Sequence, residues 1–417
     1  MTSPRAAGIL LTARRVNDRD ARMRAPWRLP PRTSRPRHFA VYEFMTGGPT
    51  RATSIDAHAR TTRRTRVLVV GCGGIGGVVL AALSDPDADV GAEVAGLTTN
   101  AGIAAATRTH GLRLRGVDGA HTVRGECLQA LPPDGTVFDW ILLATQPPQV
   151  EDAARSVVAR LAADGSMVCF QNGLCEERIA AIAGRRRVVG AVVAWGAAMP
   201  EPGVYERTSA GGFTVGWLDG AADVADAHRL DDLVLLLERI GPVTRTVNLA
   251  GARWSKLAIN CAISTLGTIG GARLGSLMVQ RSVRRLALEI MTEAVAVARA
   301  EHVQLEKVSG TIDLDWIALT DSERRASASA SLVAKHSMML AVGARYRRLR
   351  SSMLAAIERG RVPAIDYLNG EVVARGEKFD IATPFNREAQ RLVHAIARRE
   401  CTPGPELLRT YAARVAE

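Results

Sequence analysis

The first half of the chain, residues 66–247, alternates short apolar runs with segments of helical spacing. The apolar runs are rich in β-branched residues, which is typical of buried strands. They lie at residues 66–70, 93–98, 140–144, 167–170 and 188–193, and helical spacing occupies residues 78–83, 150–161 and 176–182. Strands that alternate with helices predict a parallel sheet covered by helices.

After about residue 247 the strand pattern stops. Residues 251–417 show only helical spacing, for example at 284–299. We therefore expect the α/β fold class, with a Rossmann-type parallel sheet domain at 63–247 followed by an all-α C-terminal domain at 248–417. A cleft between two such domains is a common place for cofactor and substrate to meet.

The first apolar run leads directly into a glycine-rich turn and then into a helical pattern. Gly71, Gly73 and Gly76 have the spacing G-x-G-x-x-G. In this context the first glycine permits a tight turn, the second lets a pyrophosphate approach the backbone, and the third lets helix and strand pack closely. The N-terminus of the helix would face the phosphates. The alternative is a turn that only lets the two elements pack. The expected cofactor-binding residues here are Gly71, Cys72, Gly73, Gly74, Ile75 and Gly76.

The residues after the second apolar run bear on the choice of nicotinamide cofactor. An NAD site usually places a carboxylate there for the ribose. Thr98, Thr99 and Asn100 stand at this position instead. The missing carboxylate disfavours strict NAD use, and the missing basic residue weakens the case for NADP equally. Hydroxyl and amide groups can still hold a 2′-phosphate, so NADP is expected, NAD is not excluded, and Asn100 is a candidate contact.

A line of polar side chains interrupts the apolar helical pattern at residues 253–264. Lys256, Asn260 and Ser264 are spaced i, i+4 and i+8, so they share one helix face. Buried polar groups need partners or ligands. An ammonium whose pKa is lowered can donate a proton near neutral pH, so Lys256 is the candidate general acid. The alternative is a lysine whose stem packs on the core while its head reaches water.

The scarcity of lysine in this chain strengthens the case for Lys256 as the general acid. The chain has four lysines against fifty arginines. A positive charge needed only for solubility or an ion pair would more commonly be arginine in this chain. Lysine at position 256 therefore indicates a need for an ionisable group.

Composition excludes several classes of protein. The chain is 47% hydrophobic, but no apolar run approaches the roughly 20 residues that span a bilayer. Its six cysteines show neither a C-x-x-C pair nor a His/Cys ligand spacing, so neither a metal site nor a disulfide framework is expected. A reducing cytoplasm fits this cysteine usage best.

Most of the net charge of +12 lies near the N-terminus. Residues 1–65 contain fourteen arginines and four acidic residues, so they carry about ten of the twelve excess charges. This segment is rich in Arg, Pro, Ser and Thr and lacks periodicity, so we expect residues 1–62 to be a disordered extension. Met45 is one alternative start. Residues 1–62 could contact nucleic acid weakly, and no other contact of the chain with nucleic acid is expected.

Residues 66–400 resemble the ketopantoate reductase family. The resemblance is carried by linked motifs at residues 71–76, 170–174, 254–260, 351–354 and 365–373. Members of this family use NADPH to reduce the ketone of 2-dehydropantoate on the route to pantothenate and coenzyme A. The resemblance therefore implies a small-molecule 2-oxo acid as substrate.

The resemblance also implies roles for single residues. Lys256 corresponds to the proton donor. Asn172 corresponds to an asparagine that contacts cofactor and substrate, while Asn260 and Ser352 correspond to substrate-binding residues. Gly196 falls where a small residue lines the cofactor cleft. From the residues alone, Asn172 could instead be a turn residue, and Ser351 or Ser352 could cap the helix that follows.

Other positions depart from the family pattern. Gln146, in the expected cofactor site, replaces a lysine, and Ser264, which we keep as a candidate substrate contact, replaces a second helical asparagine. Leu274 replaces a further asparagine, Ala364 a glutamate, and Asn100 a basic residue. Because a site built to hydrogen-bond a group rejects molecules lacking it, and the reverse also holds, these losses favour a less polar substrate end or a shifted binding mode.

Three functions remain open. The first is NADPH-dependent reduction of 2-dehydropantoate or a close analogue. The second is a 2-hydroxyacid dehydrogenase of the same family that acts on another branched or aromatic 2-oxo acid. The third is a non-catalytic dinucleotide-binding sensor, against which the retained Lys256 argues. The sequence leaves a homodimer open.

Deletion of residues 1–60 is expected to leave folding and steady-state kinetics intact, because this segment lacks apolar periodicity. Salt-sensitive adsorption to polyanions should weaken. Thermal unfolding, cofactor titration and heparin binding of the truncated protein test this expectation. A truncated protein that does not fold or loses cofactor affinity would contradict it.

Overall fold

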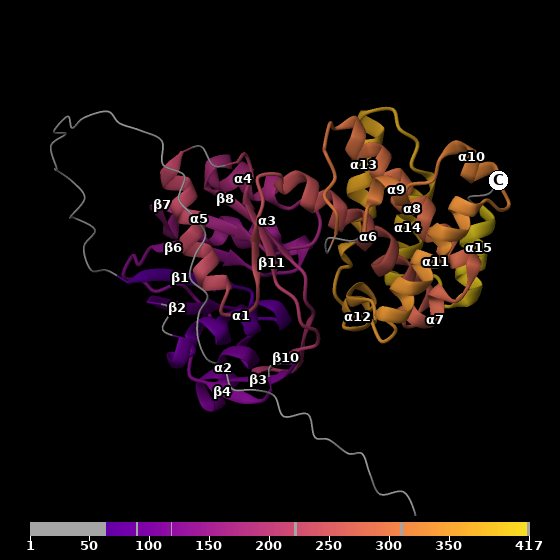
Figure 1. Ribbon diagram of the computed structural model, residues 1–417. Coiled ribbons are helices and arrows are strands. Elements are labelled where there is room, and N and C mark those ends of the chain that lie inside the picture. Colours follow the sequence, from indigo (N-terminus) through magenta and orange to yellow (C-terminus); the bar gives the residue numbers. More distant parts are fainter. Residues whose placement is uncertain (1–63, 89–90, 118, 221–222, 309–311, 415–417) are drawn as a thin grey trace, which may run out of the picture. The chain divides into compact units, whose positions relative to one another are not determined.

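The structure is a computed structural model that describes residues 64–88, 91–117, 119–220, 223–308 and 312–414 (Figure 1). The expected disordered extension, residues 1–62, lies outside this part of the chain. Within the described residues, no helix combines the length and the apolar character needed to cross a membrane.

The first half of the described chain contains an eight-stranded sheet with the strand order β12-β11-β8-β7-β6-β1-β2-β5. Its strands are β1 (Thr65–Val70), β2 (Ala92–Leu97), β5 (Glu126–Leu128), β6 (Phe138–Leu143), β7 (Leu161–Cys169), β8 (Val188–Val193), β11 (Phe213–Trp217) and β12 (Val243–Arg245). All neighbours pair in parallel except β8 and β11. The chain moves from β1 to β2 on one side and returns to β6 on the other. Such a reversal opens a crevice at the carboxyl ends of the strands.

Both faces of this sheet are apolar, as expected for parallel strands between helix layers. In β1, Val67 and Val69 face one core together with α1 (Gly74–Ser84). The alternate residues, Leu68 and Val70, face a second core with α3 (Val150–Val157) and α4 (Glu176–Ala183). Two further helices are α2 (Ala101–His110) and α5 (Val224–Leu237).

A second, four-stranded sheet was not predicted. Its order is β4-β3-β10-β9, formed by β3 (Leu112–Gly116), β4 (His121–Val123), β9 (Ala197–Glu201) and β10 (Val204–Arg207). The fully buried Tyr205 of β10 packs on α1, where a Cβ at Gly77 would lie 1.9 Å from its ring. These strands are short and partly exposed, so they lack the apolar runs that mark central strands.

The predicted boundaries need one correction. The helix expected over residues 150–161 ends at Val157, a 3-10 turn follows, and β7 already begins at Leu161. Val158 and Leu161 fit both the helical and the strand spacing of apolar residues, because a short apolar run does not distinguish a helix from a strand. The predicted strands otherwise match β1, β2, β6, β7 and β8.

The second half of the described chain is helical, so the predicted fold class is confirmed. Its helices are α6 (Leu249–Gly270), α7 (Leu274–Met278), α8 (Arg281–Ala300), α9 (Leu314–Ile317), α10 (Asp321–Arg325), α11 (Ala330–Arg345), α12 (Ser352–Glu358), α13 (Asn369–Lys378), α14 (Pro384–Ala397) and α15 (Pro405–Arg414). A 3-10 helix, Ala364–Tyr367, precedes α13. Helices α6 and α8 pack together at the centre of one apolar cluster.

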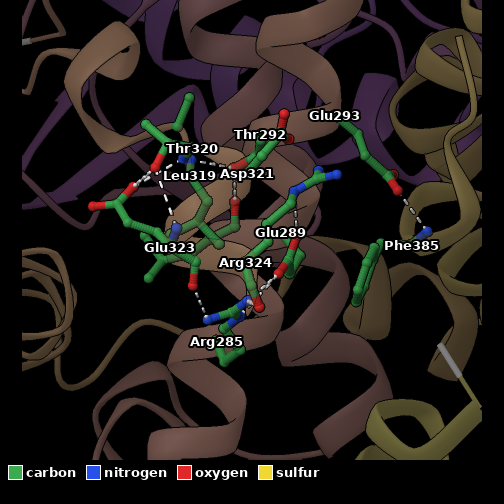
Figure 2. Close-up of polar contacts among 12 residues, drawn as sticks. Arg285, Glu289, Thr292, Glu293, Leu319, Thr320, Asp321, Glu323, Arg324 and Phe385 are labelled. Atoms are coloured by element: carbon green, nitrogen blue, oxygen red, sulfur yellow. Dashed lines mark hydrogen bonds and ion pairs between the residues drawn. The ribbon is translucent and has the colours of Figure 1, made fainter. Parts of the chain in front are cut away.

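A chain of buried polar groups fixes four of these helices. Thr265 of α6 donates to Asn369 Oδ1 (2.6 Å), Asn369 donates to Asn386 Oδ1 (2.9 Å), and Asn386 donates to Glu293 Oε2 (2.7 Å). Glu293 also accepts the backbone N–H of Phe385 (2.9 Å; Figure 2). Because each amide has partners, the network specifies how α6, α8, α13 and α14 meet.

Candidate active site

The glycine turn combines two tightly packed glycines with one open glycine. Gly71 has φ +94°, and a Cβ there would lie 2.8 Å from the backbone nitrogen of Thr145. A Cβ at Gly76 would lie 2.0 Å from the carbonyl oxygen of Gly71. A Cβ at Gly73 would meet nothing within 4 Å. Gly71 and Gly76 are therefore needed for the turn itself, whereas the space above Gly73 is left for a ligand.

The turn also presents a helix N-terminus. Gly73 is the N-cap of α1, so the N-cap residue offers no side chain to accept a hydrogen bond from the first turn, and that turn contains no acidic residue. Free backbone N–H groups and the positive end of the helix dipole favour an anion at this place. The turn thus fits the pyrophosphate of a dinucleotide.

The other residues of the turn face the protein. Cys72 is buried, with Sγ 3.7 Å from the carbonyl oxygen of Leu97, so only its backbone is suited to a cofactor contact. A Cβ at Gly74 would lie 3.0 Å from the carbonyl oxygen of Ala197. Ile75 packs against the apolar core.

Three further expected cofactor residues lie just beyond the carboxyl ends of strands. Asn100 follows β2 and is the N-cap of α2, accepting a hydrogen bond from the backbone of Ile103 (3.2 Å). Gln146 follows β6 and is exposed. Gly196 follows β8, and its N–H donates to Ser209 Oγ (2.9 Å). Their shared edge is the edge at which ligands bind in such sheets.

Lys256 reaches this edge from α6. Its ammonium donates to the carbonyl oxygen of Val193, the last residue of β8, at 2.6 Å. Burial lowers the pKa of Lys256 to about 7, and the positive charge of Arg253 adds to this effect. An ammonium has three N–H donors, so two remain for other acceptors. Lys256 can therefore exchange a proton near neutral pH.

Arg253, one turn before Lys256, forms a buried ion pair that was not predicted. Arg253 and Glu176, the first residue of α4, are each 3% exposed and are in contact through their charged groups. Arg253 also donates to the backbone carbonyl oxygens of Cys169 (2.6 Å) and Gln171 (2.9 Å). The pair therefore joins α6 to the end of β7 and to the start of α4.

The pKa values of the pair show opposing effects. Burial raises the pKa of Glu176, and the charge of Arg253 opposes that rise. For Arg253, burial acts to lower the pKa, but the negative charge of Glu176 raises it overall. Arg253 stays a cation and lowers the proton affinity of Lys256 from the same helix face. A charged residue at an apolar position of the helical pattern was the available signal for this pair.

The loop after β7 holds Asn172 at the same edge. Asn172 is exposed, and its carbonyl oxygen accepts from Cys175 Sγ (3.5 Å). Gly173 has φ +95°, and a Cβ there would lie 2.4 Å from the carbonyl oxygen of Tyr367. The loop therefore packs directly on the 3-10 helix that contains Ala364.

Asn260, one turn after Lys256, is incompletely satisfied. Its Nδ2 atom is buried and has no hydrogen-bond partner among the described residues. An unpaired buried amide costs about 1–3 kcal/mol, so such a group suggests a missing ligand. Asn260 lies on the same helix face as Lys256, and its role as a substrate contact stays a prediction.

The two serines at the start of α12 have different roles. Ser351 is the N-cap, accepting from the backbone of Leu354 (3.3 Å) and lying 2.8 Å from both Thr268 Oγ1 and the carbonyl oxygen of Ser264. Ser352 is exposed. The capping alternative thus applies to Ser351, and Ser352 remains available as a substrate contact. Ser264 is half-buried beside this cap.

Sequence comparison identifies both halves of the described chain. Residues 67–220 match the family model "Ketopantoate reductase PanE/ApbA", and residues 248–397 match "Ketopantoate reductase PanE/ApbA C terminal". The 2-dehydropantoate 2-reductase of Pyrococcus horikoshii is 23% identical over 332 residues, covering 79% of this chain and 97% of the relative. The 2-dehydropantoate 2-reductase of Halobacterium salinarum is 27% identical over 341 residues, which cover 80% of this chain and 99% of the relative.

Solved structures share the fold. A ternary structure of D-mandelate dehydrogenase with NADH and anilino(oxo)acetate has a TM-score of 0.67 at 20% identity, covering 80% of this chain and 99% of that one. The 2-dehydropantoate 2-reductase of Geobacter metallireducens has a TM-score of 0.64 at 22% identity, covering 79% and 99%.

Substitution of Gly73 separates cofactor binding from folding. Gly73→Val is expected to abolish dinucleotide binding with little change in melting temperature, because its side chain would fill open space. The matched control Gly76→Val should lower the melting temperature, since its Cβ would collide with the Gly71 backbone. Fluorescence titration with NADPH and thermal unfolding make the comparison. Unchanged affinity in Gly73→Val would show that the turn serves packing only.

Removal of both charges of the Arg253–Glu176 ion pair should shift the pH dependence of kcat to higher pH. Arg253→Met alone leaves Glu176 unpaired and should cost roughly 3–5 kcal/mol of stability. The double variant Arg253→Met/Glu176→Met removes both charges, and the pKa of Lys256 should rise because Arg253 is the larger of the two influences. The alkaline limb of kcat for 2-oxo acid reduction should then shift to higher pH. A folded double variant with an unshifted limb would contradict this positioning role.

Proposed function

Because the chain belongs to the ketopantoate reductase family, we propose that it reduces a 2-oxo acid with NADPH, with 2-dehydropantoate as the first candidate substrate. The observation that carries this proposal is Lys256. It lies at the carboxyl end of β8, and its pKa is lowered to about 7 by burial. A general acid is most effective when its pKa is near the operating pH.

The bound nicotinamide supplies the hydride, and the chain supplies position and a proton. Reduction of a ketone would place negative charge on its carbonyl oxygen. Lys256 would stabilise that charge with an N–H not used by Val193 and then donate its proton. Afterwards the neutral amine is tolerated, because burial already favours it.

Three side chains would orient the acid. The unpaired Nδ2 of Asn260 would donate to the substrate, one turn from Lys256. Asn172 on the loop after β7 and Ser352 at the start of α12 are exposed and would hold the carboxylate or a nearby hydroxyl. Fixed contacts of this kind decide which face of the ketone meets the hydride.

The cofactor would bind along the glycine turn. The pyrophosphate would approach the backbone at Gly73, in the turn that Gly71 and Gly76 shape, and Asn100 and Gln146 would contact the outer parts of the dinucleotide. The carboxylate that commonly selects NAD is missing after β2, and the hydroxyl and amide groups of Thr98, Thr99 and Asn100 could hold the 2′-phosphate of NADPH. The related D-mandelate dehydrogenase was solved with NADH, so both cofactors belong in the assay.

Ala364 supports a second, less favoured substrate class. The residue is half-buried on the 3-10 helix that contacts the Gly173 loop. Where the family places a glutamate, this chain places a methyl group, which suits an apolar end of a branched or aromatic 2-oxo acid. The names of the curated relatives favour 2-dehydropantoate. All six cysteines are free thiols, which supports a reducing compartment such as the cytoplasm.

Loss of the ammonium is the direct test of this proposal. Lys256→Ala should lower kcat by roughly 10²- to 10⁴-fold with nearly unchanged NADPH affinity, and Lys256→Arg should restore little because guanidinium does not release its proton. The control Lys307→Ala changes an exposed lysine and should keep full activity.

Substrate identity follows from the same assay. The wild-type protein is tested with NADPH and NADH on 2-dehydropantoate, a branched 2-oxo acid and phenylglyoxylate, with nicotinamide absorbance as the readout. The highest kcat/KM is expected for NADPH with 2-dehydropantoate. Turnover of none of them, or a Lys256→Ala variant that keeps most of its kcat, would refute the proposed function.

A further inference from the structure

We propose that a cavity between α8 and α11 is a second binding site, for a small carboxylate with an apolar body. The cavity has a volume of about 280 Å³ and is lined by none of the residues assigned to the reaction. This volume is near the lower end for small-molecule sites, so it suits a compact ligand. The proposal is independent of the proposed function.

Two arginines without a carboxylate partner form one side of the cavity, and Arg281 donates to the carbonyl oxygen of Ser327 (2.5 Å). Arg281 and Arg284 lie one turn apart at the start of α8. Among the described residues, no carboxylate forms an ion pair with either. Arg284 donates to the carbonyl oxygens of Met278 (2.6 Å) and Val279 (2.9 Å), and its buried Nε has no acceptor. Both guanidinium charges therefore remain uncompensated.

The neighbouring Arg285 shows the contrast. Its Nε donates to Glu289 Oε1 at 2.8 Å, and its other nitrogens donate to the carbonyl oxygens of Glu323 and Arg324 (Figure 2). The guanidinium of Arg285 is thus paired with a carboxylate and with two carbonyl oxygens of the protein. Arg281 and Arg284 on the same turn are left to meet another anion.

The N-terminus of α8 adds positive potential at the same place. This helix has 20 residues, its N-cap Gln280 makes no capping hydrogen bond through its side chain, and its first turn contains no acidic residue. Side chains lean toward the N-terminus of a helix, so those of Arg281 and Arg284 lie near its free N–H groups. Backbone donors and the helix dipole therefore reinforce the arginines.

His336 of α11 provides an independent indication of a ligand. It is 9% exposed, it lines the cavity, and its buried Nδ1 has no partner among the described residues. Burial lowers its pKa, and Arg284, Arg281 and Arg285 lower it further. The ring is therefore neutral at pH 7. A neutral imidazole with a free nitrogen can donate one hydrogen bond to a carboxylate without adding charge.

The remaining wall is apolar and selects the body of the ligand. Leu332 is buried there, while Val333 and Leu340 are 58% and 43% exposed at the rim. An inorganic anion would leave this wall in contact with water, whereas an aliphatic chain would cover it. The combination fits a carboxylate with a short hydrocarbon body.

A second cavity, beside α14, has similar residue types but no free charge. Its Arg387 pairs with Glu377, Arg391 pairs with Glu388, and His394 is 2.7 Å from Asp366. The positive residues around that cavity are therefore compensated by acidic side chains. The cavity between α8 and α11 differs in lacking such acids among the described residues.

Calorimetric titration of the full chain with hexanoate tests the proposal. Hexanoate should bind saturably, at least tenfold more tightly than acetate or inorganic phosphate, and hexylamine should not bind. Lys256→Ala should retain this binding, which distinguishes the cavity from the reaction site. Val333→Glu places a competing carboxylate at the exposed rim and should abolish binding without loss of folding or kcat.

Two further variants complete the test. Arg281→Gln/Arg284→Gln should weaken hexanoate binding at least tenfold, and the control Arg348→Gln, at an exposed arginine outside the cavity, should not. Equal binding of acetate and hexanoate, or hexanoate binding that survives Val333→Glu, would overturn the proposal. So would sedimentation showing a dimer that Val333→Glu dissociates, because the cavity would then be an interface between two copies.

Discussion

The buried ion pair between Arg253 and Glu176 is the contact on which the arrangement of the reaction site depends. Two charges at 3% exposure carry a large desolvation cost, which only close pairing and further hydrogen bonds offset. Arg253 makes those bonds to carbonyl oxygens at the end of β7, so they hold α6 against that strand. The next turn of α6 then brings Lys256 to the end of β8, and the following turn brings Asn260 to the same face.

The pair also sets the charge balance around Lys256. Burial is the main reason that the pKa of Lys256 falls to about 7; the positive charge of Arg253 lowers it further, and the single carboxylate of Glu176 offsets only part of that effect. Between this pKa and the ordinary lysine value of 10.5 the unfolded chain binds more protons than the folded chain, so this group makes the free energy of unfolding rise with pH in that window. Below about pH 7 its full cost is present. The stability lost there is the cost of holding a proton donor in a buried site.

Sequence patterns were sufficient for five adjacent strands of the main sheet (β8, β7, β6, β1 and β2), for the helical second half and for the polar line of α6, because these features rest on periodicity and glycine chemistry that one segment reveals alone. The outer strands β5, β11 and β12 were not predicted. Sequence patterns were not sufficient for the second sheet, whose short strands are held by Tyr205 packing on Gly77 of α1. The Arg253–Glu176 pair joins positions 77 residues apart, and periodicity carries no information about such contacts. Sequence patterns also did not show that Ser351 caps α12 while Ser352 stays exposed, because this depends on where α12 meets α6.

The pKa of Lys256 is the quantity that tests this account most directly. The chain has only four lysines, so reductive ¹³C-methylation followed by NMR gives few signals, and Lys256→Arg identifies the one of interest. The account predicts a titration midpoint near 7 for Lys256. A midpoint for Lys256 close to 10.5 would contradict it, because the ammonium would then be an ordinary solvated cation and not a buried proton donor.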